Sequence, residues 1–142
     1  MLDAATPLLA VKDLQAWYGE SYILHGVDFD VRAGEVVTLL GRNGAGKTTT
    51  LRSLIGLTHA REGTIRIFGQ ETTAWAPYKV AALGVGFVPE VRRILANLSV
   101  DENLRVPLER KGAGTHPRVY APFPRLHARH GRMARLLGLE GR

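Results

Sequence analysis

Apolar and polar residues alternate along several short stretches of the chain, and each alternation predicts a β-strand with one exposed face. The pattern is clearest where Val27, Phe29 and Val31 are separated by charged residues. Residues 63–68 repeat it, and the apolar-rich stretch Leu8–Tyr18 is also extended in character. These three stretches are therefore predicted to be strands, with a turn at residues 33–34 after the second of them.

Two uninterrupted apolar runs predict a different kind of strand. Glu35–Leu40 reads EVVTLL, a run rich in β-branched residues that would suit a strand buried on both faces. Val85–Val88 has the same character and stops at Pro89. We therefore expect both runs to lie inside a sheet whose two faces are covered.

Helical spacing appears first behind residue 48. Leu51, Leu54 and Ile55 recur on one side of a helix, and Gly56 is placed to end it. A second helix is predicted at residues 78–83, and the pattern Ser99-x-x-Glu102 is a capping box that opens a third. From residue 112 the pattern degrades, and only a weak helix is predicted, at 124–137.

The composition is that of a folded α/β chain. It has 142 residues, of which 45% are hydrophobic and 23% charged, which allows one domain of ordinary size. Because cysteine is absent, a disulfide scaffold, a cysteine-ligated zinc site and an iron–sulfur site are excluded. No apolar stretch approaches the ~20 residues of a membrane-spanning helix, and no secretory signal is visible, so a cytosolic type of protein is expected.

The net charge of +6 is concentrated at one end of the sequence. Residues 110–142 carry eight basic groups and one acidic group, whereas the rest of the chain is nearly balanced. Such an excess can indicate contact with nucleic acid or an anionic membrane. This stretch lacks the interleaved aromatic residues that stack on bases, so we expect a solvated basic surface and no nucleic-acid partner.

Residues 41–48 match the phosphate-binding pattern G-x-x-x-x-G-K-[ST] at every fixed position. Glycines allow successive backbone N–H groups to turn inward around a phosphate, and the N-terminal end of the following helix adds partial positive charge. Lys47 is expected to reach the β- and γ-phosphates, and the Thr48 hydroxyl to ligate Mg²⁺. The predicted phosphate-binding residues are Gly41, Asn43, Gly44, Ala45, Gly46, Lys47, Thr48 and Thr49.

Together with its surroundings, this loop resembles the nucleotide-binding domain of ATP-binding cassette (ABC) transporters. The resemblance covers roughly residues 8–130 and includes the preceding G-E-V-V-T-L-L, the upstream Trp17-Tyr18-Gly19, the stretch His25–Phe29 and the G-x-I-x-x-x-G pattern of residues 63–69. Residues 87–93 and 97–104 resemble the branch that serves importers of branched-chain amino acids. The implied fold is a P-loop NTPase-type α/β domain with an N-terminal antiparallel β subdomain, the start of a parallel-sheet core and part of a helical subdomain.

The resemblance also implies roles for two further residues. Tyr18 would stack on adenine, the alternative being a strand tyrosine packed in the core; its neighbour Trp17 would point to the opposite face. Glu90 stands where most of the family has a glutamine that contacts Mg²⁺ or the attacking water. It is therefore a possible second metal contact, the alternative being a solvated loop carboxylate.

Parts of the family's machinery have no counterpart in these residues. The signature L-S-G-G-Q and the apolar strand ending in Asp-Glu, which supplies the general base, are absent, and no histidine can be assigned as the γ-phosphate sensor. We expect a partial domain, well matched over 8–110 and basic over 111–142, that is cut before the signature. No catalytic residue is identified, and we expect ATP binding without hydrolysis.

The resemblance implies a subunit that binds ATP and Mg²⁺ and pairs with permease subunits and a second nucleotide-binding subunit. It would lie in the cytoplasm, peripheral to the inner face of the membrane through its permease. The first interpretation is an importer subunit for branched-chain or related hydrophobic amino acids. The alternatives are a non-catalytic nucleotide-binding remnant, an ATPase subunit for another substrate such as urea or lipopolysaccharide, and, last, a basic nucleic-acid binder.

Overall fold

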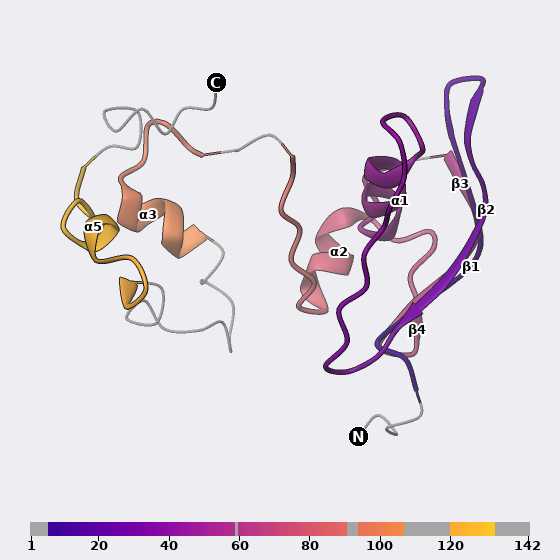
Figure 1. Cartoon of the computed structure of the whole chain (residues 1–142), viewed down its shortest axis with the longest axis horizontal. Helices are drawn as coiled ribbons and strands as arrows, with labels where there is room; N and C mark the ends of the chain where they lie inside the picture. The colour runs from indigo at the N-terminus through magenta and orange to yellow at the C-terminus, as the bar shows by residue number, and fades with distance from the viewer. Residues whose placement is uncertain (1–5, 59, 91–93, 107–119, 133–142) are drawn as a thin grey trace. The chain divides into compact units, whose positions relative to one another are not determined.

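The computed structural model describes residues 6–58, 60–90, 94–106 and 120–132. These residues fall into two compact units, 1–87 and 88–142, and each unit is described by itself. The first unit holds a four-stranded sheet and two helices, and the second holds short helices (Figure 1).

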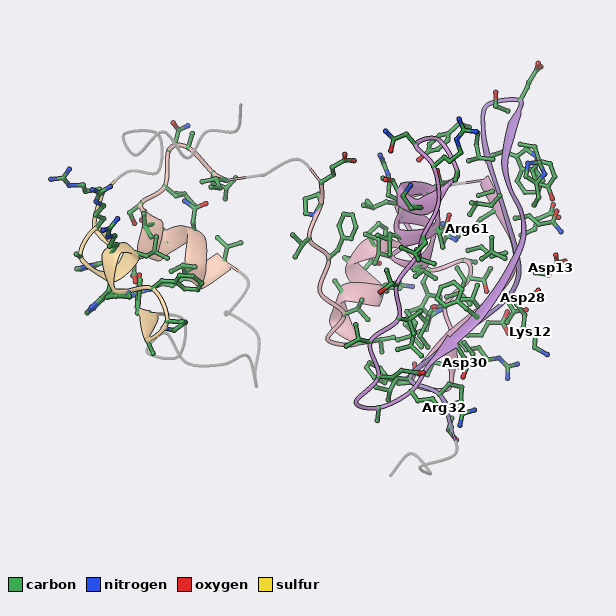
Figure 2. The ribbon with its side chains drawn as sticks, viewed as in Figure 1. Lys12, Asp13, Asp28, Asp30, Arg32 and Arg61 are labelled. Carbon is green, nitrogen blue, oxygen red and sulfur yellow. The ribbon has the colours of Figure 1, made fainter. Side chains whose placement is uncertain are left out.

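The sheet of the first unit is antiparallel throughout, with the strand order β2-β1-β3-β4. Side chains on one face form the core, in which Leu14, Ala16 and Ile65 are fully buried. The opposite face carries charged residues, among them Lys12, Asp13 and Asp28, which point away from the helices in Figure 2. The strands are β1 (Leu9–Tyr18), β2 (Ser21–Val31), β3 (Ala60–Ile67) and β4 (Gln70–Glu71), so the three strands predicted from alternation are confirmed.

The three longest strands of this sheet share a β-bulge. We call this bulge, formed by Asp13, Gly26 and Gly63, the crease. Asp13 of β1 has a positive φ of 47°, and the pairing of β1 with both neighbours is irregular at this point. Glycines lie beside it on the neighbouring strands: Gly26 of β2 has φ 83° and Gly63 of β3 has φ 92°. A Cβ at Gly63 would lie 2.2 Å from the Asp13 carbonyl oxygen, and one at Gly26 would lie 2.7 Å from the Asp13 carboxylate. The bulge therefore requires glycine at position 63, where the obstacle is main chain, whereas at Gly26 the positive φ is the stronger reason for glycine, since the Asp13 carboxylate can move.

Helices α1 (Lys47–Leu54) and α2 (Pro77–Ala82) lie against the apolar face of the sheet (Figure 1). Each places one side chain in the core, Leu54 from α1 and Val80 from α2. Helix α1 ends as predicted at Gly56, which has φ 77°. The Gly56 and Leu57 amides donate to carbonyl oxygens of the last turn, at 3.1 and 2.8 Å, and so close the helix.

The run Glu35–Leu40 is not the doubly buried strand predicted from its composition. It has no regular secondary structure, and Val36 and Leu40 are 91% and 88% exposed. A β-strand exists only through hydrogen bonds to a neighbouring strand, and no described residue pairs with this run. Composition specified a β-type segment, but the pairing partner that would make it a strand is not among the described residues.

The same correction applies to Val85–Val88, which is also irregular and whose Val88 is 91% exposed. The helix predicted at 124–137 is shorter than expected in its described part. Helix α5 covers only Pro124–His127, and residues 128–132 form turns. Arg and His alternate with apolar residues there, so no continuous apolar stripe is present to hold a longer helix. Residues 133–137 lie outside the described residues.

In the second unit, helix α3 (Val100–Arg105) begins with the predicted capping box. The Ser99 hydroxyl accepts from the Glu102 amide at 3.2 Å, and the Glu102 carboxylate accepts from the Ser99 amide at 2.7 Å. The Val100 and Asp101 amides donate to carbonyl oxygens of residues 132 and 130, both at 3.0 Å. The segment after α5 thus supplies acceptors for two backbone amides at the start of α3, where a helix has no acceptors of its own.

The side chain of Tyr120 connects α3 with α5. Its hydroxyl donates to the Asp101 carboxylate at 2.9 Å, and its ring lies 4.8 Å from that of His127. Burial, reinforced by the bond to the Asp101 carboxylate, raises the pKa of Tyr120. Across the described part of the chain, no helix is both long and apolar enough to span a bilayer.

Candidate functional site

The loop of residues 41–46 leads into α1 and takes its shape from glycines (Figure 1). Gly44 and Gly46 have φ values of 84° and 92°, a region that side-chain-bearing residues rarely adopt. A Cβ at Gly46 would lie 2.6 Å from Cδ2 of Leu24 in β2. The loop turns back on itself where the Ala45 amide donates to the Arg42 carbonyl at 3.1 Å. The sequence pattern therefore corresponds to a real steric requirement at this site.

Lys47 holds its ammonium group against the start of the loop. Its Nζ donates to the carbonyl oxygens of Gly41 at 2.6 Å and Arg42 at 2.8 Å. An ammonium has three donors, so one remains for a further acceptor. No described carboxylate forms an ion pair with it. The result is an oriented positive charge at the loop that lacks an anionic partner among the described residues.

The first turn of α1 is open to an anion. Gly46 is its N-cap and gives no side-chain cap, and the first turn contains no acidic residue. The Thr50 amide and hydroxyl donate to the Gly46 carbonyl, at 2.8 and 2.9 Å. The earlier amides, those of Lys47, Thr48 and Thr49, precede the first intrahelical bond and point toward the loop end of the helix. The Thr48 side chain is exposed, whereas Thr49 is buried.

Tyr18 ends β1, the strand that packs on α1. It pairs with Ser21 across the hairpin and is 46% exposed. Strand alternation places it on the same face as the fully buried Ala16. Trp17 lies on the other face, where its ring stacks on that of Tyr22 at a centroid distance of 4.8 Å. Tyr18, rather than Trp17, is therefore on the side of the sheet that carries the loop and α1.

Glu90 is exposed and follows an irregular stretch at the start of the second unit. The loop belongs to the first unit, so the structure does not test a contact between Glu90 and a metal held by Thr48. The family resemblance would also place the neighbouring Arg92 and Arg93 toward a permease, and both residues lie outside those that the structure describes.

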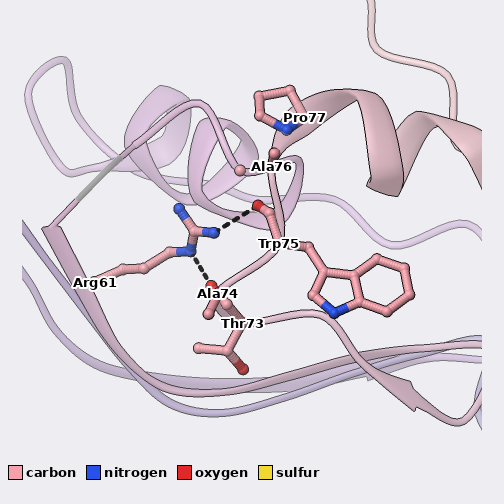
Figure 3. A pocket seen from close by; sticks show the side chains of 7 residues that line it. Arg61, Thr73, Ala74, Trp75, Ala76 and Pro77 are labelled. Atoms are coloured by element: carbon pink, nitrogen blue, oxygen red, sulfur yellow. Dashed lines mark hydrogen bonds between the residues drawn. The ribbon is translucent and has the colours of Figure 1, made fainter.

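Sequence reasoning missed one charged group, Arg61 of β3. Its guanidinium bonds to the carbonyl oxygens of Thr73 and of Trp75, the latter at 3.0 Å (Figure 3), and also to that of Thr58. Burial lowers the pKa of Arg61. The group lines a pocket of about 370 Å³ together with Gly56 and residues 73–77. Two of its three partners are carbonyl oxygens more than ten residues away in the sequence, so no local motif predicts these bonds. The bonds join the stretch that follows α1 to the segment before α2.

Comparison with known families places this geometry in context. Residues 24–141 match the family model described as ABC transporter. The chain belongs to the ABC transporter family. A solved ATP-binding subunit of an ABC transporter superposes with a TM-score of 0.75 at 34% identity, over 89% of this chain and 54% of that one. The fold is the ATP-binding cassette of P-loop NTPases, as predicted, with its antiparallel β subdomain formed.

Several curated ABC proteins share about two fifths of their aligned residues with this chain. The Nod factor export ATP-binding protein I of Ralstonia nicotianae is 41% identical over 102 residues, which are 72% of this chain and 31% of that protein. The high-affinity branched-chain amino acid transport ATP-binding protein BraG of Pseudomonas aeruginosa is 39% identical over 97 residues, 68% of this chain and 42% of that protein. This ABC chain thus spans well under half the length of these relatives.

Proposed function

We propose that this chain binds the phosphates of ATP at residues 41–49. The observation that supports this most directly is the position of Lys47, whose ammonium is fixed by two loop carbonyls and keeps one donor free. The open first turn of α1 adds backbone donors and partial positive charge beside it. A triphosphate would satisfy this lysine and these amides together, which a neutral ligand would not.

The side chains of three residues would add contacts to the metal ion and to the base of the nucleotide. The exposed Thr48 hydroxyl is an oxygen donor of the kind Mg²⁺ accepts, and a magnesium ion there would neutralise charge on the β- and γ-phosphates. Tyr18, exposed at the end of β1, would stack on adenine. Glu90 remains a candidate second oxygen contact for the metal.

Nucleotide binding is tested with a fluorescent ATP analogue and Mg²⁺, comparing the unchanged chain with Lys47→Ala. Lys79→Ala in α2 is the matched control, because it removes the same charge from the last turn of another helix. Loss of a charge-assisted bond to phosphate should weaken binding about tenfold or more in the first variant and leave the second unchanged. Equal binding by all three proteins would contradict the proposal.

The wider role we propose is that of an ATP-binding subunit of an importer for branched-chain amino acids. It would work with permease subunits and a second nucleotide-binding subunit, at the membrane only through them. BraG and the probable branched-chain amino acid transport protein LivF of Archaeoglobus fulgidus, 35% identical over 99 residues, support this substrate class. The Nod factor export protein favours a second candidate, an exporter subunit.

A chimaera distinguishes these two candidates. The matched stretch of BraG is replaced by the corresponding residues of this chain, and the same exchange is made in the Nod factor export protein. Restored uptake of branched-chain amino acids by the BraG chimaera alone would support the importer. Restored export by the other chimaera alone would favour the exporter, and Lys47→Ala in either chimaera should abolish the restored transport.

A further inference from the structure

Residues 123–132 of the second unit, which we call the basic turn segment, carry positive charge and no negative charge. The segment holds Arg125, Arg129 and Arg132 and contains neither aspartate nor glutamate. All three arginines are exposed, and none of the ion pairs among the described residues includes them. Figure 2 shows nitrogen-bearing side chains gathered around α5. The segment therefore presents three unpaired guanidinium groups to solvent over a short length of chain.

Main-chain hydrogen bonds hold the basic turn segment in place. The Leu126 amide donates to the Phe123 carbonyl at 3.0 Å, and the Arg129 and Arg132 amides donate to carbonyl oxygens three residues earlier, at 3.1 and 3.0 Å. The segment is also fixed to α3, because the carbonyl oxygens of residues 130 and 132 accept from the first amides of that helix. These bonds use backbone atoms, so the arginine side chains stay available, and a partner that binds them does not have to order the chain first.

A large apolar side chain is exposed at the start of the same segment. Phe123 is the N-cap residue of α5 and is 59% exposed. It stands between Pro122 and Pro124, which are also exposed and have no backbone N–H that would lose its water on burial. An aromatic ring exposed beside arginines fits the boundary between the headgroups and acyl chains of a bilayer. There the ring leaves water while the cations stay among the headgroups.

The exposed ring changes the interpretation of this surface. The sequence predicts only a solvated basic surface, and a nucleic acid would neutralise the arginines without the interleaved aromatic residues that stack on its bases. A bilayer with anionic lipids satisfies both features, since its headgroups attract the arginines and its interface buries the ring.

We propose that the basic turn segment binds the anionic surface of a lipid bilayer, with its arginines at the headgroups and Phe123 in the interface. This contact goes beyond the proposed function, in which permease subunits alone hold the chain at the membrane. It rests on the charge and exposure of residues 123–132 and does not depend on nucleotide binding.

Co-sedimentation with lipid vesicles measures this contact. One set of vesicles is phosphatidylcholine alone, and the other also contains phosphatidylglycerol, whose headgroup is negatively charged. The 142-residue chain should bind the second set and leave the first unbound, and added salt should weaken the binding because it screens the surface charge. Each arginine beside an anionic bilayer strengthens binding about fivefold, so the combined variant Arg125→Gln, Arg129→Gln and Arg132→Gln should bind about a hundredfold more weakly.

The matched control removes the same net charge from the first unit. It combines Lys12→Gln, Arg66→Gln and Lys79→Gln, at three exposed residues, and should bind the anionic vesicles within about twofold of the unchanged chain, because attraction to the bilayer falls off within a Debye length. A third variant, with lysine at the three arginine positions of the segment, keeps the charge and should bind as the unchanged chain does. Loss of binding in the lysine variant would indicate a specific bidentate anion site and overturn the proposal.

The contribution of the ring is tested separately. Phe123→Ser should weaken binding to the anionic vesicles about tenfold, because the serine side chain has no apolar surface to bury. Tyr78→Ser in α2 is the matched control, since Tyr78 is 72% exposed but lies in the first unit, and it should leave binding unchanged.

Equal losses in the glutamine variant and its control would assign the attraction to overall net charge and overturn the proposal. So would equal binding to both sets of vesicles, or unchanged binding by Phe123→Ser. Binding to duplex DNA in place of vesicles, lost in the glutamine variant, would assign the segment to nucleic acid. Absence of vesicle binding in a chain that still binds the ATP analogue would overturn this inference and leave the proposed function standing, and vesicle binding without nucleotide binding would do the reverse.

Discussion

At Gly63 a methyl group would have to occupy space that the main chain of β1 already fills. The Asp13 carbonyl oxygen would be 2.2 Å from the new Cβ, and φ is 92°. Relief requires backbone movement, which is much more costly than turning a side chain. This position is therefore the most sensitive glycine of the sheet.

Gly63→Ala is expected to lower the free energy of unfolding by about 3 kcal/mol or more, as a steric clash adds to an unfavourable φ. Gly34→Ala is the matched control. Gly34 has a φ of 76° but nothing within 4 Å of its Cβ, so only the conformational cost of about 1 kcal/mol remains. Urea unfolding of both variants measures the difference, and equal losses would refute the clash.

The residues that could be predicted from sequence are those whose role is local. Gly44 and Gly46 are required by their own positive φ, and Lys47 bonds to carbonyl oxygens within the loop, so the spacing of these residues is enough to predict them. Asp13 and Arg61 could not be predicted, because their positions depend on carbonyls and glycines from other strands and loops. Tertiary contacts of this kind leave no pattern in a single sequence.

At the scale of elements, the Glu102 carboxylate stabilises the first turn of α3 through the capping box. Hydrogen bonds from the Ser99 amide and hydroxyl lower the pKa of Glu102 below its ordinary value of 4.5. A carboxyl group whose pKa is lowered on folding stabilises the folded state above its unfolded pKa. That contribution is lost as the pH falls below about 4.5 and through the folded pKa of Glu102.

Acidification is therefore expected to speed amide exchange in α3, after correction for the intrinsic pH dependence of exchange. Glu102→Gln keeps an acceptor oxygen but cannot titrate, so its α3 should lack this part of the pH dependence. Asp101 is a second carboxylate in the first turn of α3 and bonds to Arg105 at 3.0 Å, which makes the comparison with Glu102→Gln necessary. An identical pH profile in both proteins would show that the capping box does not carry the effect.

The helix ends that depend on local contacts were predicted correctly, as were the three strands that alternate apolar and polar residues, but the uninterrupted apolar runs were not. The capping box of α3 and the glycine end of α1 both lie within a few residues of the helix they close. The run Glu35–Leu40 has equally clear sequence signals, yet none of the strands that the structure describes pairs with it and the run is irregular. Propensity describes what a segment can form, and pairing decides whether it does.

For the whole molecule, binding and turnover are expected to separate. The proposed phosphate contacts lie within one loop and one helix, whereas hydrolysis requires a general base and a positioned water as well. The 142 residues contain neither the L-S-G-G-Q signature nor an apolar strand ending in Asp-Glu. Phosphate release from ATP should therefore stay at the level of a Lys47→Ala blank, and lysine-dependent release above it would contradict this expectation.

The crease at Asp13, Gly26 and Gly63 has a consequence for how the sequence can change over time. A side chain at Gly63 collides with the main chain of residue 13 and one at Gly26 meets the Asp13 carboxylate, and both glycines have the positive φ that the bulge at residue 13 imposes on its neighbours. Single replacements are thus selected against, and the three positions should be inherited or lost as a set. In an alignment of related sequences they would appear as a co-varying trio drawn from three strands, and so report the register of the sheet without any coordinates.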